Sequence, residues 1–266
     1  QMATLPRMKP KTFYDLVVEV SIIRPGPIVG GMMNPYLNRR QGREPITYPH
    51  PKLEPVLRRT LGVPLFQEQL LRIAMDAANF TGGEAEELRR AMGFKRSMER
   101  MQAIEAKLRE GLNANGIRGE AEDAIVRSIT SFALYGFPES HAASFALIVY
   151  ATCYLKAHHP AAFLASLLNC QPMGFYSPAT LVKDFQRRHV RVRPVCVQHS
   201  SVLCTLEDDH TVRLGLRYVS GVRKEAILAI EHHRASGGPF VSLQDFVRRT
   251  RLHKNELDIL AEVGAL

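Results

Sequence analysis

The chain has 266 residues, of which 45% are hydrophobic, so it can bury one large core or two smaller ones and does not have the composition of a disordered chain. Its net charge of +9 and pI of about 9.6 favour an acidic partner such as nucleic acid. No apolar run reaches the length of a membrane span, and the N-terminus lacks the layout of a signal peptide, so we expect a cytoplasmic protein.

The first half of the chain shows apolar residues at helical spacing. This spacing predicts helices over residues 11–23, 66–79, 83–92, 97–113 and 120–134. The segment from Asn34 to Pro64 is rich in proline and short polar turns, and we predict an extended connection there. Within it, Arg39, Arg40 and Arg43 could meet a nucleic-acid backbone or form a solvated surface.

A stiff loop follows the first of these helices. Its sequence, R-P-G-P-I from Arg24 to Ile28, contains two prolines that fix the backbone. Arg24 stands at the mouth of the loop. It could reach a phosphate, or it could be an ordinary exposed loop arginine.

Three cations lie within seven residues at the end of the helix over 83–92. Arg89 and Arg90 occupy its last turn, where they complement the helix dipole, and Lys95 follows a glycine. A guanidinium matches phosphate oxygens with two hydrogen bonds, and a lysine adds a point charge. The group therefore fits either a triphosphate site or a plain helix end.

The stretch from Ser131 to Ala146 holds a loop between two apolar runs. Pro138 prevents a helix from running straight through, and Ser140 stands where we expect the N-cap of the next helix. The start of that helix would present unpaired N–H groups together with His141, which favours an anion. The alternative is a simple corner between two helices.

The next helix is predicted over residues 141–158. Its middle, from Ser144 to Leu155, is apolar almost all round, so we expect it to be the buried central helix. A further helix over 161–168, a linker over 171–178 and a helix over 180–188 follow. Alternating residues then predict strands over 191–197, 201–206 and 211–216, with a hairpin turn at 207–210.

The four cysteines show no C-x-x-C spacing, which is consistent with a reducing compartment. Cys196 and His199, followed by Cys204 and His210, have a spacing that faintly resembles a zinc site. Both cysteines lie in runs predicted as strands, however, so we expect no metal site.

A tight glycine turn precedes the helix predicted over 225–234 and is typical of a helix-hairpin-helix motif. Its glycine would let backbone N–H groups face a DNA phosphate while two cations add charge. The alternative is a structural corner between helices. The candidate DNA-binding residues are Ser220, Gly221, Val222, Arg223 and Lys224.

Five segments together resemble the C family of bacterial DNA polymerases, the replicative alpha subunits. They are R-P-G-P-I at 24–28, F-Q-E-Q at 66–69, L-R-R-A-M-G-F-K at 88–95, Y-G-F-P-E-S-H-A at 135–142 and L-K-A-H-H-P-A-A-F at 155–163. Their order and spacing also match, so the resemblance covers nearly the whole chain. The pair Pro138-Glu139 is similar to the accessory, error-prone (translesion) branch, where replicative members usually have Asn-Lys.

The resemblance implies a mainly α fold. We expect a multi-helix fingers domain over 1–170, a linker helix with a small β-hairpin element over 171–215, and a helix-hairpin-helix region over 216–266. The chain would then be a piece of a DNA-directed DNA polymerase that acts in DNA repair. By the same resemblance, the incoming deoxynucleoside triphosphate is held by Arg24, Arg89, Arg90, Lys95, Ser140 and His141.

The family's catalytic carboxylates belong to a palm domain that would precede residue 1, so this chain should contain no catalytic residue and be inactive alone. Mg²⁺ would be bound outside it. Expected partners are primer–template and duplex DNA, nucleoside triphosphates, a sliding clamp and mutagenesis accessory proteins. The alternative function is a non-enzymatic helix-hairpin-helix DNA-binding adaptor.

Overall fold

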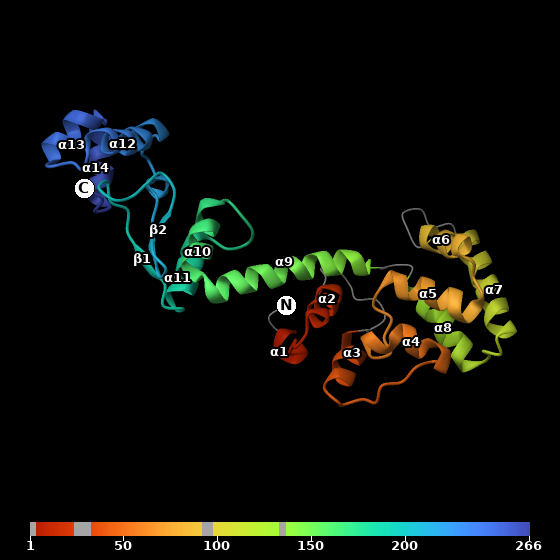
Figure 1. The fold of residues 1–266 in the computed structure, drawn as a ribbon. Coiled ribbons are helices and arrows are strands. Elements are labelled where there is room, and N and C mark those ends of the chain that lie inside the picture. The colour runs from red at the N-terminus through yellow and green to blue at the C-terminus, as the bar shows by residue number, and fades with distance from the viewer. Residues whose placement is uncertain (1–3, 24–32, 92–97, 133–136) are drawn as a thin grey trace. The chain divides into compact units, whose positions relative to one another are not determined.

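The computed structural model describes residues 4–23, 33–91, 98–132 and 137–266. Within these ranges the chain is mainly helical with one small sheet, which confirms the predicted fold class (Figure 1). It divides into two compact units, residues 1–150 and 151–266. The three-part division at residues 170 and 215 stays a prediction. In the described ranges, no helix combines the length and apolar character needed to cross a membrane.

The first unit consists of short and medium-length helices. They are α1 (Leu5–Met8), α2 (Phe13–Ile22), α3 (Met33–Arg40), η1 (Pro51–Leu53), α4 (Glu54–Leu57), η2 (Arg58–Thr60), α5 (Gln67–Ala78), α6 (Gly82–Ala91), α7 (Met98–Ala114), α8 (Glu120–Phe132) and the start of α9 (Glu139–His158). The helices predicted from apolar spacing are confirmed, with ends that differ by at most two residues.

The prediction of an extended connection over 34–64 was wrong, because this segment contains α3, η1, α4 and η2. Its prolines do not break these helices. Pro51 and Pro55 lie in the first turn of η1 and of α4. A first-turn residue has no intrahelical use for its N–H, so proline is tolerated there and its fixed φ suits the helix.

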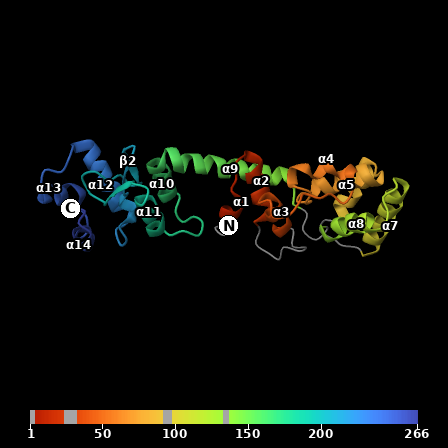
Figure 2. The same cartoon turned by 90° about the horizontal axis from the view of Figure 1, so that it is seen from below.

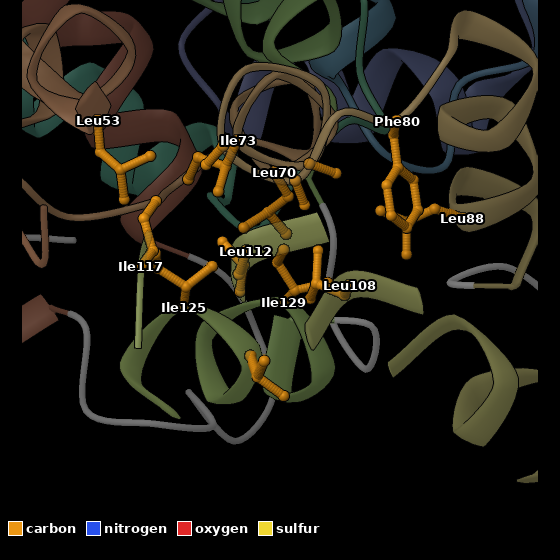
Figure 3. Close-up of a cluster of buried hydrophobic side chains, with 14 of the residues drawn as sticks. Leu53, Leu70, Ile73, Phe80, Leu88, Leu108, Leu112, Ile117, Ile125 and Ile129 are labelled. Carbon is orange, nitrogen blue, oxygen red and sulfur yellow. The ribbon is translucent and has the colours of Figure 1, made fainter. Parts of the chain in front are cut away.

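The larger core of this unit lies between α5, α7 and α8. Leu70 and Ile73 of α5 point toward Leu108 and Leu112 of α7 (Figure 3), and all four are buried. Ile125 and Ile129 of α8 close the cluster from the other side. The apolar stripes read from the sequence therefore form this core.

A second cluster joins α1, α2 and α3 to the beginning of α9. Only Ala142 and Ala146 of α9 are buried, and both belong to this cluster. Farther along, Leu147 and Tyr150 are 61% and 57% exposed. The prediction of a buried central helix was therefore wrong. Only two alanines near the start of α9 reach this core, because the helix continues past it without another described layer packing over its middle.

The second unit contains short helices and one sheet. Its elements after α9 are α10 (Pro160–Asn169), α11 (Pro178–Gln186), β1 (Arg191–Arg193), β2 (Thr205–Asp208), β3 (Thr211–Arg213), η3 (Leu216–Tyr218), α12 (Lys224–Gly237), α13 (Leu243–Thr250) and α14 (Lys254–Glu262). Helices α10 and α11 lie side by side in both views (Figure 1, Figure 2).

The predicted hairpin is present, with β2 and β3 antiparallel and a bulge between Leu206 and Asp208. Strand β1 pairs in parallel with the other edge of β3, which gives the order β1-β3-β2. All three strands are shorter than predicted. The residues 194–197 and 201–204 leave the ladder, and Val195 and Val197 instead join the core under α12 to α14.

The close crossing of α5 and α7 yields a first prediction. A Cβ at Gly111 would lie 2.0 Å from the backbone oxygen of Ala78, which cannot move without displacing α5. Gly111→Ala should therefore lower the free energy of unfolding by about 1–3 kcal/mol or more. The measurement is chemical denaturation followed by circular dichroism.

Gly83→Ala provides the control, because Gly83 lies in α6 with nothing within 4 Å of its added Cβ. Alanine is the better helix former, so this variant should be as stable as the parent or slightly more stable. Equal stability of the two variants would contradict the proposed close contact.

Candidate functional sites

Two of the motif segments meet at the corner between α5 and α9. The amide of Gln67 donates to the carbonyl of Phe137 at 3.0 Å, and the amide of Glu139 donates to the Glu68 carboxylate at 2.9 Å. The Tyr14 hydroxyl donates to Glu139 at 2.7 Å. F-Q-E-Q and Y-G-F-P-E-S-H-A are some seventy residues apart in the chain, and the fold joins them by hydrogen bonds.

Gln69 holds the same corner from inside. Its side-chain oxygen accepts from the amides of Leu65 and Phe66 at 2.9 and 3.1 Å. Its NH₂ group donates to the carbonyl of Val56 and the hydroxyl of Thr60 at 3.1 and 2.8 Å. A buried amide with every group partnered fixes its neighbours strongly. This motif is therefore structural, a role that the sequence alone did not reveal.

Arg59 and Tyr14 cover the outside of this corner. The Arg59 guanidinium lies 3.7 Å from the centre of the Tyr14 ring and 3.9 Å from a Glu139 oxygen. Burial, followed by the hydrogen bond to Glu139, raises the pKa of Tyr14 well above its usual value. The tyrosine therefore stays protonated and acts as a fixed donor to Glu139.

The start of α9 differs from the predicted cap. The helix begins at Glu139, and the amide of Ala142 donates to the carbonyl of Pro138, so Ser140 lies inside the first turn and is not the N-cap. The helix therefore begins two residues earlier than predicted, directly after Pro138. Ser140 and His141 are both exposed.

The His141 ring lies between two phenylalanines. Its centre is 5.3 Å from that of Phe137 and 4.6 Å from that of Phe145, both in edge-on geometry. These contacts limit the ring's freedom while its side chain stays open to solvent.

The two arginines at the end of α6 share one carboxylate. Arg89 donates from two nitrogens to Glu86, both at 2.7 Å, and the Arg90 Nε donates to the same group at 3.1 Å. The Arg89 bonds, and then those of Arg90, lower the pKa of Glu86 to about 2. The Arg90 side chain is 74% exposed and that of Arg89 is 49% exposed.

Of the other predicted triphosphate contacts, the structure describes only some. Lys95 and Arg24 lie outside the described residues. Among the described ones, no hydrogen bond or ion pair joins Arg89 or Arg90 to Ser140 or His141. Their convergence on one nucleotide stays a prediction.

In the second unit, the turn at Ser220 and Gly221 connects η3 to α12. Gly221 has φ +88°, a conformation that only glycine adopts without strain, and a Cβ there would lie 2.9 Å from the Ile259 side chain. Helix α12 begins at Lys224 without a side-chain cap. The first N–H groups of such a helix have no partner within it, so they can bind an anion.

Arg223 is committed to a neighbour. Its Nε and one terminal nitrogen donate to Glu256 of α14 at 2.8 and 3.0 Å, and its backbone amide donates at 3.2 Å. Glu256 is buried at 1% exposure and also accepts from the amide of His253. Lys224 is exposed and has no ion pair with a described residue, so it is the freer cation of the two.

Comparisons with known proteins show two matching regions in this chain. The family profile "Bacterial DNA polymerase III alpha subunit finger domain" matches residues 1–116, and the profile "Helix-hairpin-helix motif" matches residues 189–266. Residues 1–116 therefore match the finger domain of the bacterial DNA polymerase III alpha-subunit family. The resemblance inferred from the five segments is thereby confirmed.

Similar proteins align with the whole length of this chain. Error-prone DNA polymerases from Corynebacterium efficiens and Pseudomonas syringae pv. syringae are each 51% identical to it, and one from Anaeromyxobacter sp. (strain K) is 52% identical. All three alignments include 100% of this chain but only 24%, 26% and 24% of the respective relatives. The chain thus spans about a quarter of the length of these polymerases.

The Arg223–Glu256 contact behind the helix-hairpin-helix turn yields a second prediction. The bonds from Arg223 outweigh burial and, with the His253 amide, lower the pKa of Glu256 to about 2. A depressed folded-state pKa stabilises the fold above the unfolded value of about 4.3, and this contribution is lost as the pH falls toward 2. Glu256→Gln should remove that contribution and lower stability at pH 7 by about 1–3 kcal/mol.

The measurement is a series of denaturation midpoints from pH 7 to pH 2 for the parent and the variant. Their difference in stability should be largest near neutral pH and shrink below pH 4. Glu262→Gln, at an exposed position at the end of α14, is the control and should follow the parent curve. A parent-like curve for Glu256→Gln would mean that the ion pair contributes nothing.

Proposed function

We propose that this chain is the part of an error-prone, DNA-directed DNA polymerase that holds the incoming nucleotide and the primer–template. The observation that carries the proposal is the 51–52% identity to error-prone DNA polymerases over the entire chain, finger domain included. An adaptor would need the helix-hairpin-helix motif but not the finger domain. The proposed role is translesion synthesis in DNA repair.

Nucleotidyl transfer requires two metal ions held by carboxylates. In the ranges that the structure describes, no three His, Cys, Asp or Glu side chains gather as a metal-binding group. The proposal assigns the Mg²⁺ ions to the parts of the polymerase that this chain does not span. The sliding clamp and accessory proteins stay predictions from the family resemblance.

For the nucleotide, the geometry favours Arg90 over Arg89. Arg90 uses one N–H on Glu86 and is largely exposed, so its other donors are available to phosphate oxygens. Arg89 has two of its nitrogens bonded to Glu86 and is less exposed, so fewer of its donors are available. Ser140, His141, Lys95 and Arg24 complete the proposed set by resemblance.

For DNA, the proposed contact is the start of α12. The backbone N–H groups of its first turn and the side chain of Lys224 together suit one or two phosphates of a duplex. Such contacts position the backbone and carry no sequence information. Arg223 supports them indirectly by fixing the turn against α14.

The first test of the proposal is primer extension. The chain alone, with Mg²⁺, primer–template and all four nucleotides, should give no product, whereas the full-length polymerase should extend the primer. Synthesis by the chain alone would contradict the assignment of the catalytic carboxylates to another part.

A second test uses Arg90→Ala in the full-length polymerase. Loss of a charged donor to the triphosphate should lower kcat/KM for nucleotides about tenfold or more, equivalent to roughly 1.4 kcal/mol. Arg72→Ala is the matched control, because Arg72 is also an exposed helical arginine paired with an acidic residue four positions away. Parent-like kinetics for alanine variants at both Arg89 and Arg90 would show that they only complete a helix.

A third test compares two lysines at equivalent helix starts. Lys224 begins α12 and Lys254 begins α14, and both are exposed. Lys224→Gln should weaken duplex binding equally across sequences and reduce the slope of log K against log salt by about one unit. Lys254→Gln should reduce this slope less than Lys224→Gln does. Equal effects would point to general surface charge and away from a specific hairpin contact.

A further inference from the structure

A basic hollow of about 890 Å³ lies in the first unit, between the α1–α2 turn and the end of α3. Among the residues that the structure describes, no carboxylate lines it. Its charged lining residues are Arg7, Lys9, Lys11, Arg39, Arg40 and Arg43. Neither the family match nor the proposed hairpin contact assigns a role to this hollow.

One of the six charges is compensated inside the fold. Arg40 donates to Asp15 at 2.7 Å. Burial opposes ionisation of Asp15, but the bonds from Arg40 and from the amides of Lys11 and Thr12 outweigh it and lower its pKa to about 2. The two charges therefore cancel, and Arg40 acts as a structural wall of the hollow.

The charge of Arg39 is not compensated. Its guanidinium donates only to neutral oxygens, the carbonyls of Leu61 and Thr47 at 2.7 and 3.2 Å and the Thr47 hydroxyl at 3.0 Å. Its Nε is buried without a hydrogen-bond partner. The positive charge is thus fixed in place at the hollow.

The four remaining cations are available to a ligand. Arg7, Lys9, Lys11 and Arg43 are exposed, and none of them forms an ion pair with a described residue. With Arg39 they place five uncompensated positive charges around one hollow. Elsewhere in the described chain, the exposed arginines of η2, α5 and α6 have carboxylate partners.

Three hydrogen bonds hold the segments that supply these cations together. The Gln41 side chain donates to the carbonyl of Arg7 at 2.9 Å, and Arg40 donates to the carbonyls of Met8 and Lys9 at 2.5 and 3.1 Å. The end of α3 is therefore fixed to the α1–α2 turn. Like charges held close together without a counter-charge repel each other, and an anion would relieve that repulsion.

We propose that this hollow binds the phosphodiester backbone of DNA, as a contact additional to the one at α12. Cations from two chain segments suit successive phosphates along a strand. No aromatic ring lines the described hollow for base stacking, and the Gln41 amide is already engaged, so the contact is independent of sequence. This inference rests on the proposed function, which supplies DNA as the partner.

The test is DNA binding by the whole 266-residue chain over a salt series, with single-stranded and duplex probes of unrelated sequence. The triple variant Arg7→Gln, Lys11→Gln, Arg43→Gln should reduce the slope of log K against log salt by about two units on the preferred probe. Its unchanged melting temperature would show that it folds. The single variant Arg43→Glu, at a position in an exposed turn, should also lower the affinity for DNA.

The matched control removes three charges elsewhere, as Lys52→Gln, Arg58→Gln, Lys183→Gln, all at exposed positions. If this variant weakens DNA binding as much as the first, the inference fails while the proposed function stands. Triphosphate or inorganic phosphate could also displace DNA from the parent chain at concentrations that leave DNA bound to the triple variant of the hollow. That result would show that the hollow binds a free phosphate ligand and not DNA. If the parent chain binds neither probe, the proposed function itself is overturned.

Discussion

A buried polar side chain must find hydrogen-bond partners, and in the described parts of the chain three such side chains do so as the third residue of a helix. Asp15 in α2, Gln69 in α5 and Glu256 in α14 each accept the amide at the start of their own helix. Each also binds a distant segment, through Arg40, the Val56 carbonyl and Arg223 respectively. One side chain therefore ends a loop, starts a helix and fixes a tertiary contact.

The same constraint divides the cations into those that pair with buried carboxylates and those that remain exposed. Arg40 and Arg223 face buried carboxylates and serve the fold, because releasing them would leave a negative charge without a partner. Arg90 and Lys224 are exposed and keep donors for a ligand. A polymerase that grips its substrates through phosphates needs the second kind, and the first kind keeps the surfaces that carry them rigid.

The proposed DNA contacts lie in both units, at the basic hollow near α3 and at the turn before α12. Neither offers a set of side chains suited to reading bases. The hollow depends on charged side chains, and the turn before α12 depends on charge and on backbone N–H groups. A polymerase that copies any template benefits from contacts of this kind, because their strength does not vary with sequence.

The amino-acid sequence by itself determined most helices, the β-hairpin and the family, because apolar spacing, caps and motif order are local or linear properties. It failed over 34–64, where proline starts helices as readily as it ends them, and for α9, whose apolar surface did not predict its burial. Only the tertiary structure decided that F-Q-E-Q holds the α9 corner and that Arg223 belongs to Glu256. A cation looks the same in sequence whether or not a carboxylate from a distant helix faces it, so its availability is set by the packed fold alone.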